Sequence, residues 1–157
     1  MLRSCRVVLS MVVLAAAGLF AQVAPASATH IPGCYGTRIE HVPLKYDTTV
    51  VGYVDLYYSS SNGGTNCVKT ISAGPSAGVS KFMLAKVYRC TGGAGSTCVD
   101  GFGGFDQRDE DKGNFASYAG PVSVTNTSAR CVSFVGLVTW GGRQISAGSS
   151  PKAVHCG

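Results

Sequence analysis

The sequence has 157 residues, with 13 Lys and Arg, 8 Asp and Glu and 21 glycines, and its formal net charge is +5. The basic residues are spread singly, whereas a nucleic-acid-binding surface gathers them on one stripe, so this composition argues against nucleic acid as a partner. The low charge and the abundance of Gly, Ser, Thr, Val and Tyr favour short strands and tight turns over helices.

An export signal is predicted at the start of the chain. Arg3 and Arg6 give a positive start, residues 7–20 are apolar, and Ala26-Ser27-Ala28 supplies the small residues of a cleavage site. The apolar run is shorter than the ~20 residues that span a bilayer, so we expect cleavage after Ala28 and no membrane span in the product. Residues 1–28 are therefore assigned as a signal peptide and residues 29–157 as a single secreted domain. The secreted domain keeps eleven Lys and Arg against eight Asp and Glu.

The cysteine content predicts a disulfide framework. Cys5 leaves with the signal, and the even set that remains would meet an oxidising compartment: Cys34, Cys67, Cys90, Cys98, Cys131 and Cys156. Six cysteines allow fifteen pairings. The glycine-rich segment between Cys90 and Cys98 can bring these two together, and the most local choice is favoured for the other four, Cys34 with Cys67 and Cys131 with Cys156. Metal sites need closer Cys or His pairs, so no metal or other cofactor is expected.

The clearest predicted element is a β-hairpin that begins at Val50. Residues 50–59 alternate, so that Val54 and Leu56 can enter a core while Tyr53 and Tyr57 lie on the opposite face. Residues 60–64, Ser-Ser-Asn-Gly-Gly, supply the positive φ angles of a turn, and residues 66–71 return as the second strand.

Further strands are predicted downstream. Residues 79–90 also tolerate a helix, but the bracketing glycines and the aromatic content favour a strand. Residues 91–113 carry seven glycines and a charged cluster, which predicts a long loop held at its root by Cys98. Strands are also expected at residues 115–118, 121–125, 131–140 and 153–156. Short strands at short intervals predict an all-β domain, a small antiparallel sandwich or barrel with three disulfides.

No catalytic constellation is recognised. A hydrolase needs a nucleophile, a base and an orienting group. After export the histidines are His30, His41 and His155, of which only His41 lies away from the chain ends, and no serine occupies a Gly-x-Ser-x-Gly elbow. We expect no enzymatic activity and no catalytic residues, unless folding brings His41 within hydrogen-bond reach of a serine and a carboxylate.

The acidic segment at residues 106–114 is a candidate calcium site, because carboxylates close in sequence can coordinate a hard cation. Its spacing departs from the helix-loop-helix calcium pattern, and Arg108 and Lys112 partly neutralise it. A solvated loop tip is favoured over a metal site.

Tyr53 and Tyr57 are the candidate ligand surface, because two tyrosines on one strand face can stack on sugar rings or pack against another protein. The alternative is that they are ordinary residues of a β surface, since strands are enriched in tyrosine anyway. The sequence favours this alternative.

Several segments resemble one family. They are Cys34-Tyr35-Gly36, Val54-Asp55-Leu56-Tyr57-Tyr58, Asn62-Gly63, Asn66-Cys67-Val68, residues 111–122 with Phe115-Ala116-Ser117-Tyr118-Ala119-Gly120-Pro121-Val122, Cys131-Val132 and Cys156-Gly157. Together they cover most of the secreted domain, and it resembles the spore-associated protein A family of small secreted proteins from filamentous actinobacteria. The resemblance implies a non-catalytic protein of the cell or spore surface, with matching cysteines at Cys34, Cys67, Cys131 and Cys156. Cys90, Cys98 and the glycine-rich loop depart from the family pattern.

The sequence thus favours a secreted, non-catalytic structural protein associated with spores or the cell surface. The alternatives are an extracellular module that binds polysaccharide or cell wall, and a secreted inhibitor whose Cys90 to Cys98 loop would have to be rigid and protruding. The expected partners are cell-wall or spore-surface components, and the sequence leaves the oligomeric state open.

Overall fold

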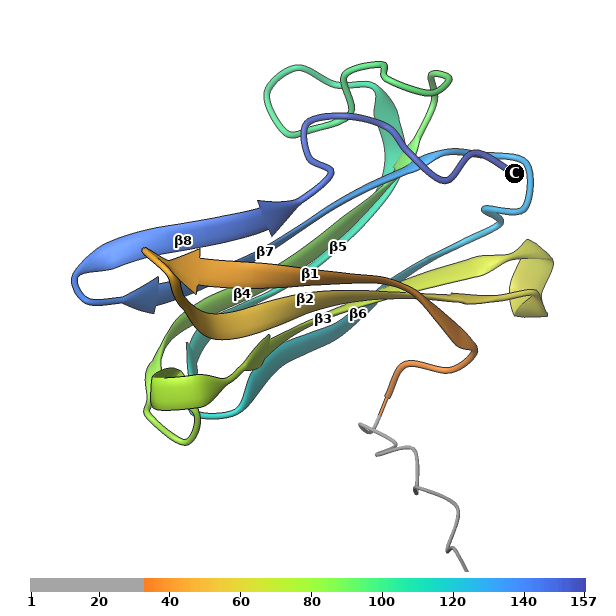
Figure 1. Ribbon diagram of the computed structural model, residues 1–157. Helices are drawn as coiled ribbons and strands as arrows, with labels where there is room; N and C mark the ends of the chain where they lie inside the picture. The colour runs from red at the N-terminus through yellow and green to blue at the C-terminus, as the bar shows by residue number, and fades with distance from the viewer. Residues whose placement is uncertain (1–32) are drawn as a thin grey trace, which may run out of the picture. The chain divides into compact units, whose positions relative to one another are not determined.

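A computed structural model describes residues 33–157, so the predicted signal peptide and His30 lie outside the described residues. Two four-stranded antiparallel sheets pack face to face (Figure 1). We call them the A sheet, with strand order β1-β2-β3-β6, and the B sheet, with order β5-β4-β7-β8. The predicted all-β sandwich is confirmed, and the barrel alternative is not needed because the two sheets remain separate. No helix within residues 33–157 is long and apolar enough to cross a membrane.

The elements follow one another along the chain as eight strands with two short 3-10 turns. Their bounds are β1 Thr37–Tyr46, β2 Thr49–Ser59, η1 Ser61–Gly63, β3 Thr65–Ser72, η2 Gly74–Ser76, β4 Lys81–Cys90, β5 Phe105–Phe115, β6 Tyr118–Thr125, β7 Val132–Trp140 and β8 Arg143–Gly148.

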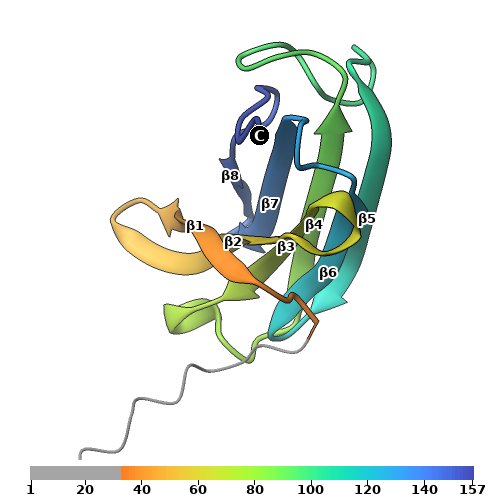
Figure 2. The ribbon, with the colours of Figure 1, turned by 90° about the vertical axis from the view of Figure 1, so that its right-hand side faces the viewer.

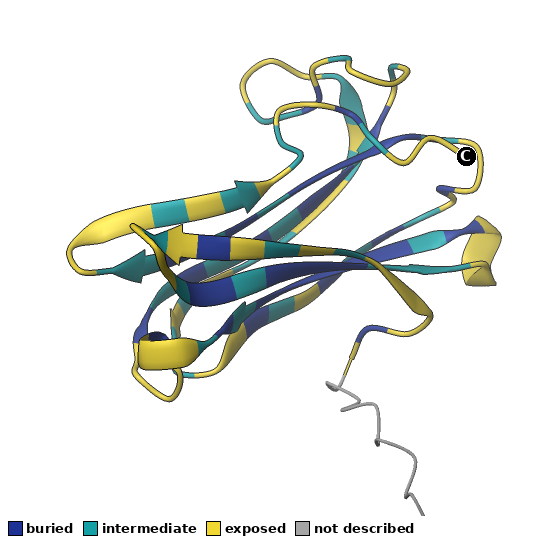
Figure 3. Ribbon diagram, viewed as in Figure 1, coloured by how far each residue is buried: buried dark blue, intermediate teal, exposed yellow. Residues whose placement is uncertain are grey.

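The core lies between the sheets and consists mainly of valine. Val54, Leu56 and Val68 enter it from the A sheet, and Met83 and Phe134 from the B sheet. Burial of such side chains stabilises the fold by about 1.5–3 kcal/mol each before entropy is counted. The strands with the most buried residues, β2, β3, β4 and β7, are central in their sheets (Figure 3).

The central strands are the ones that the sequence predicted. The hairpin of β2 and β3 is confirmed, and its turn has positive φ at Asn62, Gly63 and Gly64. The strand assignments of residues 79–90, 121–125 and 131–140 are confirmed as β4, β6 and β7, with β4 beginning at Lys81 and β7 at Val132. The edge strands β1 and β8 were not predicted.

Two predicted strands are wrong. Residues 115–118 contain the connection between β5 and β6. Residues 153–156 form no strand, and only Val154 makes an isolated bridge, to Val132. Cys156 is instead held by its disulfide to Cys131, which fixes the tail beside β7 without a continuous ladder.

The acidic segment is also placed differently from the prediction. It forms β5, an edge strand paired with β4, and not a solvated loop tip. Alternate side chains of β5 accept hydrogen bonds from the backbone of β6: Gln107 from Thr125 N at 3.1 Å, Asp109 from Ser123 N at 2.9 Å and Asp111 from Gly120 N at 2.7 Å. We call these three side chains the acceptor row. The row joins the edges of the two sheets, which lie side by side in Figure 2.

The other face of β5 carries ion pairs. Glu110 pairs with Lys86 and with Lys112, and Lys86 also contacts Asp100 at 3.0 Å. Hydrogen bonds from Lys86, Tyr88 and Arg108 lower the pKa of Asp100 from 3.8 to about 2. Asp100 therefore anchors the loop that follows Cys98 to β4 and β5.

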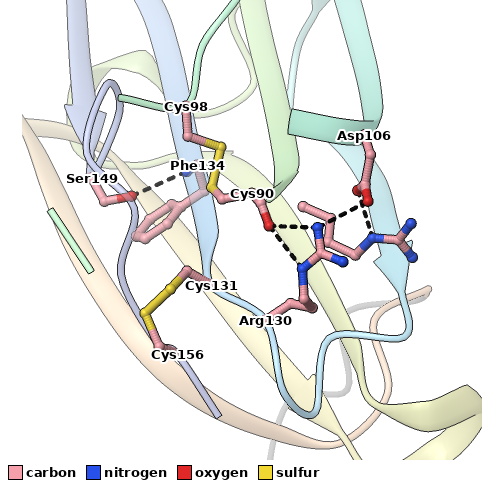
Figure 4. Close-up of a disulfide and its surroundings, with 9 residues drawn as sticks. Cys90, Cys98, Asp106, Arg130, Cys131, Phe134, Ser149 and Cys156 are labelled. Atoms are coloured by element: carbon pink, nitrogen blue, oxygen red, sulfur yellow. Dashed lines mark hydrogen bonds and ion pairs between the residues drawn. A yellow bond between two sulfur atoms is a disulfide. The ribbon is translucent and has the colours of Figure 1, made fainter. Parts of the chain in front are cut away.

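The loop between β4 and β5 is held at many points. The Cys90–Cys98 disulfide is buried at its root, and backbone hydrogen bonds join Gly95 and Cys98 to the tail at residues 151–153. Arg130 donates to the carbonyl of Cys90 and to Asp106, as Figure 4 shows. A tight turn of residues 99–103 then presents Phe102, which is 84% exposed. All three disulfides have the predicted local pairing.

Asp111→Ala should lower the free energy of unfolding by about 1–2 kcal/mol, because the Gly120 amide loses a charged acceptor. Asp111→Asn keeps an acceptor oxygen and should lose less than half as much. Urea unfolding of the three proteins measures both effects. Equal losses for the two variants would contradict the acceptor role of residue 111.

Asp100→Asn should flatten the acid dependence of stability. The folded pKa lies below its ordinary value, so the Asp100 carboxylate contributes stability above about pH 4 and loses that contribution as the pH falls towards about 2. Because Asp100 is partly exposed, the contribution is about 1 kcal/mol after solvent screening. Thermal unfolding between pH 2 and 7 tests this, with Asp47→Asn as a control for the loss of a negative charge, because Asp47 is exposed and pairs with Arg143 on the surface. If the stability of Asp100→Asn fell with decreasing pH as steeply as that of the wild type, Asp100 would not be the source of this acid dependence.

Candidate functional site

The candidate site lies on the outer face of the A sheet. The register of the strands places His41 of β1 opposite Asp55 of β2, and Asp55 opposite Lys69 of β3. Three ionisable side chains therefore form a row across three neighbouring strands. The row lies on the face opposite Val54 and Leu56, because successive strand residues alternate between the faces of a sheet.

Asp55 is the centre of this row and is only 1% exposed. Its carboxylate lies 2.5 Å from Nδ1 of His41 and 3.4 Å from Nη1 of Arg38, and it accepts a hydrogen bond of 3.3 Å from the hydroxyl of Tyr57. A buried carboxylate is tolerated only when it is paired and hydrogen-bonded. These contacts meet that requirement with side chains from two adjacent strands.

Lys69 is buried beside Asp55 and has no exposed surface. Its Nζ lies 4.0 Å from the ring centroid of Tyr118, which gives a cation–π contact. Burial lowers the pKa of Lys69, and the negative charge of Asp55 opposes that change. The contacts of Lys69 connect β3 to β6 on the same outer face.

The two tyrosines of the candidate ligand surface are held in defined orientations. The ring of Tyr53 stacks on His41, with centroids 4.1 Å apart and an angle of 16° between the planes. Tyr57 is oriented by its hydrogen bond to Asp55, and the pKa of its phenol is raised by burial and by the Asp55 carboxylate, so it stays a neutral donor. We call Tyr53, Tyr57 and His41 the tyrosine platform.

The prediction that Tyr53 and Tyr57 share the face opposite Val54 and Leu56 is confirmed, and both rings are half-buried. Whether they bind a ligand stays a prediction. The condition set for catalysis is met in one part only. His41 reaches the carboxylate of Asp55, but no hydrogen bond described within residues 33–157 joins His41 to a serine.

Sequence reasoning missed Asp55 and Lys69. Alternation placed Asp55 on the polar face of its strand, where a charged side chain is normally solvated. The hairpin register was the available signal, because a turn at residues 60–64 brings Asp55 opposite Lys69. Their burial could not be inferred, since it depends on Arg38 and His41 from β1 and on Tyr118 from β6.

Other carboxylates take part in hydrogen bonds and ion pairs that stabilise the fold. Those of β5 serve in the acceptor row and in ion pairs, and His155 pairs with Glu40 at 2.9 Å. Within residues 33–157, no group of three or more His, Cys, Asp or Glu side chains is arranged to hold a metal ion.

Comparison of the chain with protein-family models, with curated proteins and with solved structures found no match. A functional proposal must therefore stand on the geometry of the A sheet and on the sequence.

Asp55→Asn should destabilise the domain by about 3 kcal/mol, because it removes the charge that faces His41, Arg38 and the buried Lys69. Asp47→Asn is the matched control, since Asp47 is exposed and forms only a surface pair with Arg143 at 3.5 Å. Its effect should stay below about 0.5 kcal/mol. Denaturant unfolding at pH 7 compares the two, and similar small effects would contradict the central role of Asp55.

Proposed function

We propose that this chain is an exported, non-catalytic domain of the cell or spore surface, and that it is retained there by binding polysaccharide through the tyrosine platform. The observation that carries the proposal is the fixed orientation of two tyrosine rings on an outward strand face. Rings that are already ordered lose little conformational entropy when a ligand stacks on them. Tyrosine also offers both an apolar ring face and a polar group, which suits amphipathic sugar rings.

Export and surface association are supported by three features. The sequence begins with a pattern typical of a signal peptide, and the folded domain contains three disulfides, which persist in oxidising compartments. The resemblance to the spore-associated protein A family adds the cell or spore surface as the location. Cell-wall or spore-surface polysaccharides are thus the partners that the domain would meet.

A non-catalytic role is supported by the surroundings of His41. Its Nδ1 faces Asp55, and its ring is stacked on Tyr53. A base of this kind would need a nucleophile within hydrogen-bond reach. The described contacts of His41 instead orient the platform, which suits binding better than bond cleavage.

Retention on insoluble cellulose, chitin and purified peptidoglycan tests the proposal. Wild-type protein should be retained on at least one of them, and Tyr53→Ala and Tyr57→Ala should each lose most of that retention. Tyr57→Phe keeps the ring but loses the hydrogen bond to Asp55 that orients it, so its retention should lie between those of the wild type and Tyr57→Ala. Phe102→Ala is the control, because it removes an exposed aromatic ring from the loop between β4 and β5.

Full retention of both alanine variants would overturn the platform as the binding surface. A wild-type protein that passes through all three materials would favour the structural surface protein over the binding module. Circular dichroism of each variant confirms that the sheets are intact.

A secreted inhibitor is a second candidate, favoured by the loop between β4 and β5. Its disulfide, its hydrogen bonds to the tail and the anchored Asp100 hold Phe102 in one exposed position. Phe102 lies in a tight turn, so it would act as a side chain inserted into an apolar pocket. An enzyme inhibited by the wild type and equally by Phe102→Ala would exclude this role for Phe102.

A further inference from the structure

A hollow of about 220 Å³ lies on the outer face of the A sheet, next to the tyrosine platform. Hydroxyl and amide side chains make up most of its lining: Ser59, Ser61, Asn62, Thr65 and Ser123, together with Tyr35. We call it the hydroxyl hollow. The platform and the hollow share β2, on which Tyr53, Asp55, Tyr57 and Ser59 are alternate residues and therefore lie on one face.

The floor of the hydroxyl hollow is formed by three paired strands. Cys67 of β3 lies opposite Tyr57 of β2 on one side and opposite Ser123 of β6 on the other. At a rise of about 3.4 Å per residue, Tyr57 and Ser59 are about 7 Å apart along β2. The platform therefore leads directly into the hollow.

The walls of the hollow are fixed by backbone contacts. The turn at η1 is tied to the loop between β6 and β7 by hydrogen bonds from Asn126 N to Asn62 O, from Thr127 N to Gly64 O and from Ser128 N to Gly63 O. The opposite wall is held by the Cys34–Cys67 disulfide. Gly33 lies so close to Pro121 that a Cβ would be 2.4 Å from its Cγ, and this contact also fixes the wall. The hollow is thus formed before any ligand arrives.

The chemistry of the hollow suits a neutral sugar. Its lining within the described part of the chain includes no Lys, Arg, His, Asp or Glu, so a phosphate or a uronate would meet no countercharge there. Asn62 is exposed and Ser123 half-buried, and none of the described side-chain hydrogen bonds uses the Asn62 amide or the Ser123 hydroxyl. Tyr35 lies in the lining and is 72% exposed.

We infer that the hydroxyl hollow is a subsite for one neutral, hydroxyl-rich sugar unit of a polysaccharide chain that runs along β2 from the tyrosine platform. This inference rests on the proposed function and adds the class of sugar that the site selects. Stacking on the platform retains any chain of sugar rings. Hydrogen bonds from Asn62 and Ser123 select, in the hollow, a neutral sugar unit whose hydroxyl groups are placed to meet them.

Titration calorimetry or NMR titration with three soluble probes tests the inference. The probes are cellopentaose and chitopentaose, which are neutral, and pentagalacturonate, which is anionic. The wild type should bind a neutral probe and bind pentagalacturonate more weakly. Asn62→Gly and Ser123→Ala should each lower the affinity for the neutral probe about three- to tenfold, the loss expected for one neutral hydrogen bond.

Asn62→Gly is a mild variant, because glycine adopts the positive φ of 54° at this position. The matched control is Asn126→Gly, which makes the same change at a second asparagine with φ of 53°; it keeps the backbone N–H that bonds to Asn62 O, and residue 126 does not line the hollow. This control should bind as the wild type does. Unchanged affinity in Asn62→Gly and Ser123→Ala, or preference for pentagalacturonate, overturns the inference.

The same titrations separate this inference from the proposed function. If Tyr53→Ala and Tyr57→Ala abolish binding while Asn62→Gly and Ser123→Ala do not weaken it, the platform stands and the hollow is overturned. If only the hollow variants weaken binding, the hollow stands and the platform is wrong. A wild type that binds neither neutral probe overturns the subsite, while its retention on peptidoglycan still tests the platform.

Discussion

The acceptor row of Gln107, Asp109 and Asp111 joins the edges of the two sheets, and the sandwich depends on this contact as well as on its core. No disulfide within residues 33–157 joins a strand of the A sheet to a strand of the B sheet. The row also occupies the backbone amides along the free edge of β6. An open strand edge invites pairing with another chain, so side chains that occupy it protect the domain from edge-to-edge association.

With its sheets joined at this edge, the sandwich buries two ionisable groups on the outer face of the A sheet. Asp55 and Lys69 are buried there, although nothing about an outward strand face requires it. Removing two charges from water costs several kcal/mol each, and close contacts offset this cost only if the geometry is fixed. Asp55 fixes His41 and Tyr57, and His41 in turn fixes Tyr53. Asp55 therefore orients the side chains of the tyrosine platform, whereas Lys69 contacts Tyr118 of β6.

Much of the A sheet follows from the sequence, because β2 and β3 are adjacent in the chain and alternate clearly. The disulfides also follow, since each closes a local loop. β1, β5 and β8 were not predicted, because these edge strands are largely exposed and alternate over short stretches only. The charged residues of β5 predicted a loop. Their place in a strand becomes clear only from the backbone amides of β6, which donate to the acceptor row. In the candidate site, the alternation of β2 alone places Tyr53 and Tyr57 on one face. The burial of Asp55 also depends on Arg38 and His41 of β1, a strand that the sequence did not predict.

The hairpin of β2 and β3 carries both tyrosines of the platform and most of the floor of the hydroxyl hollow, so one local element supplies most of the proposed binding face. Two lining residues come from elsewhere, Tyr35 from the segment before β1 and Ser123 from β6. Stacking on the platform uses ring faces, which differ little among sugars, whereas hydrogen bonds in the hollow depend on where each hydroxyl points. Retention and selectivity are thereby assigned to different residues. Selectivity can then vary through the residues that line the hollow, while Asp55, which orients the platform, stays unchanged.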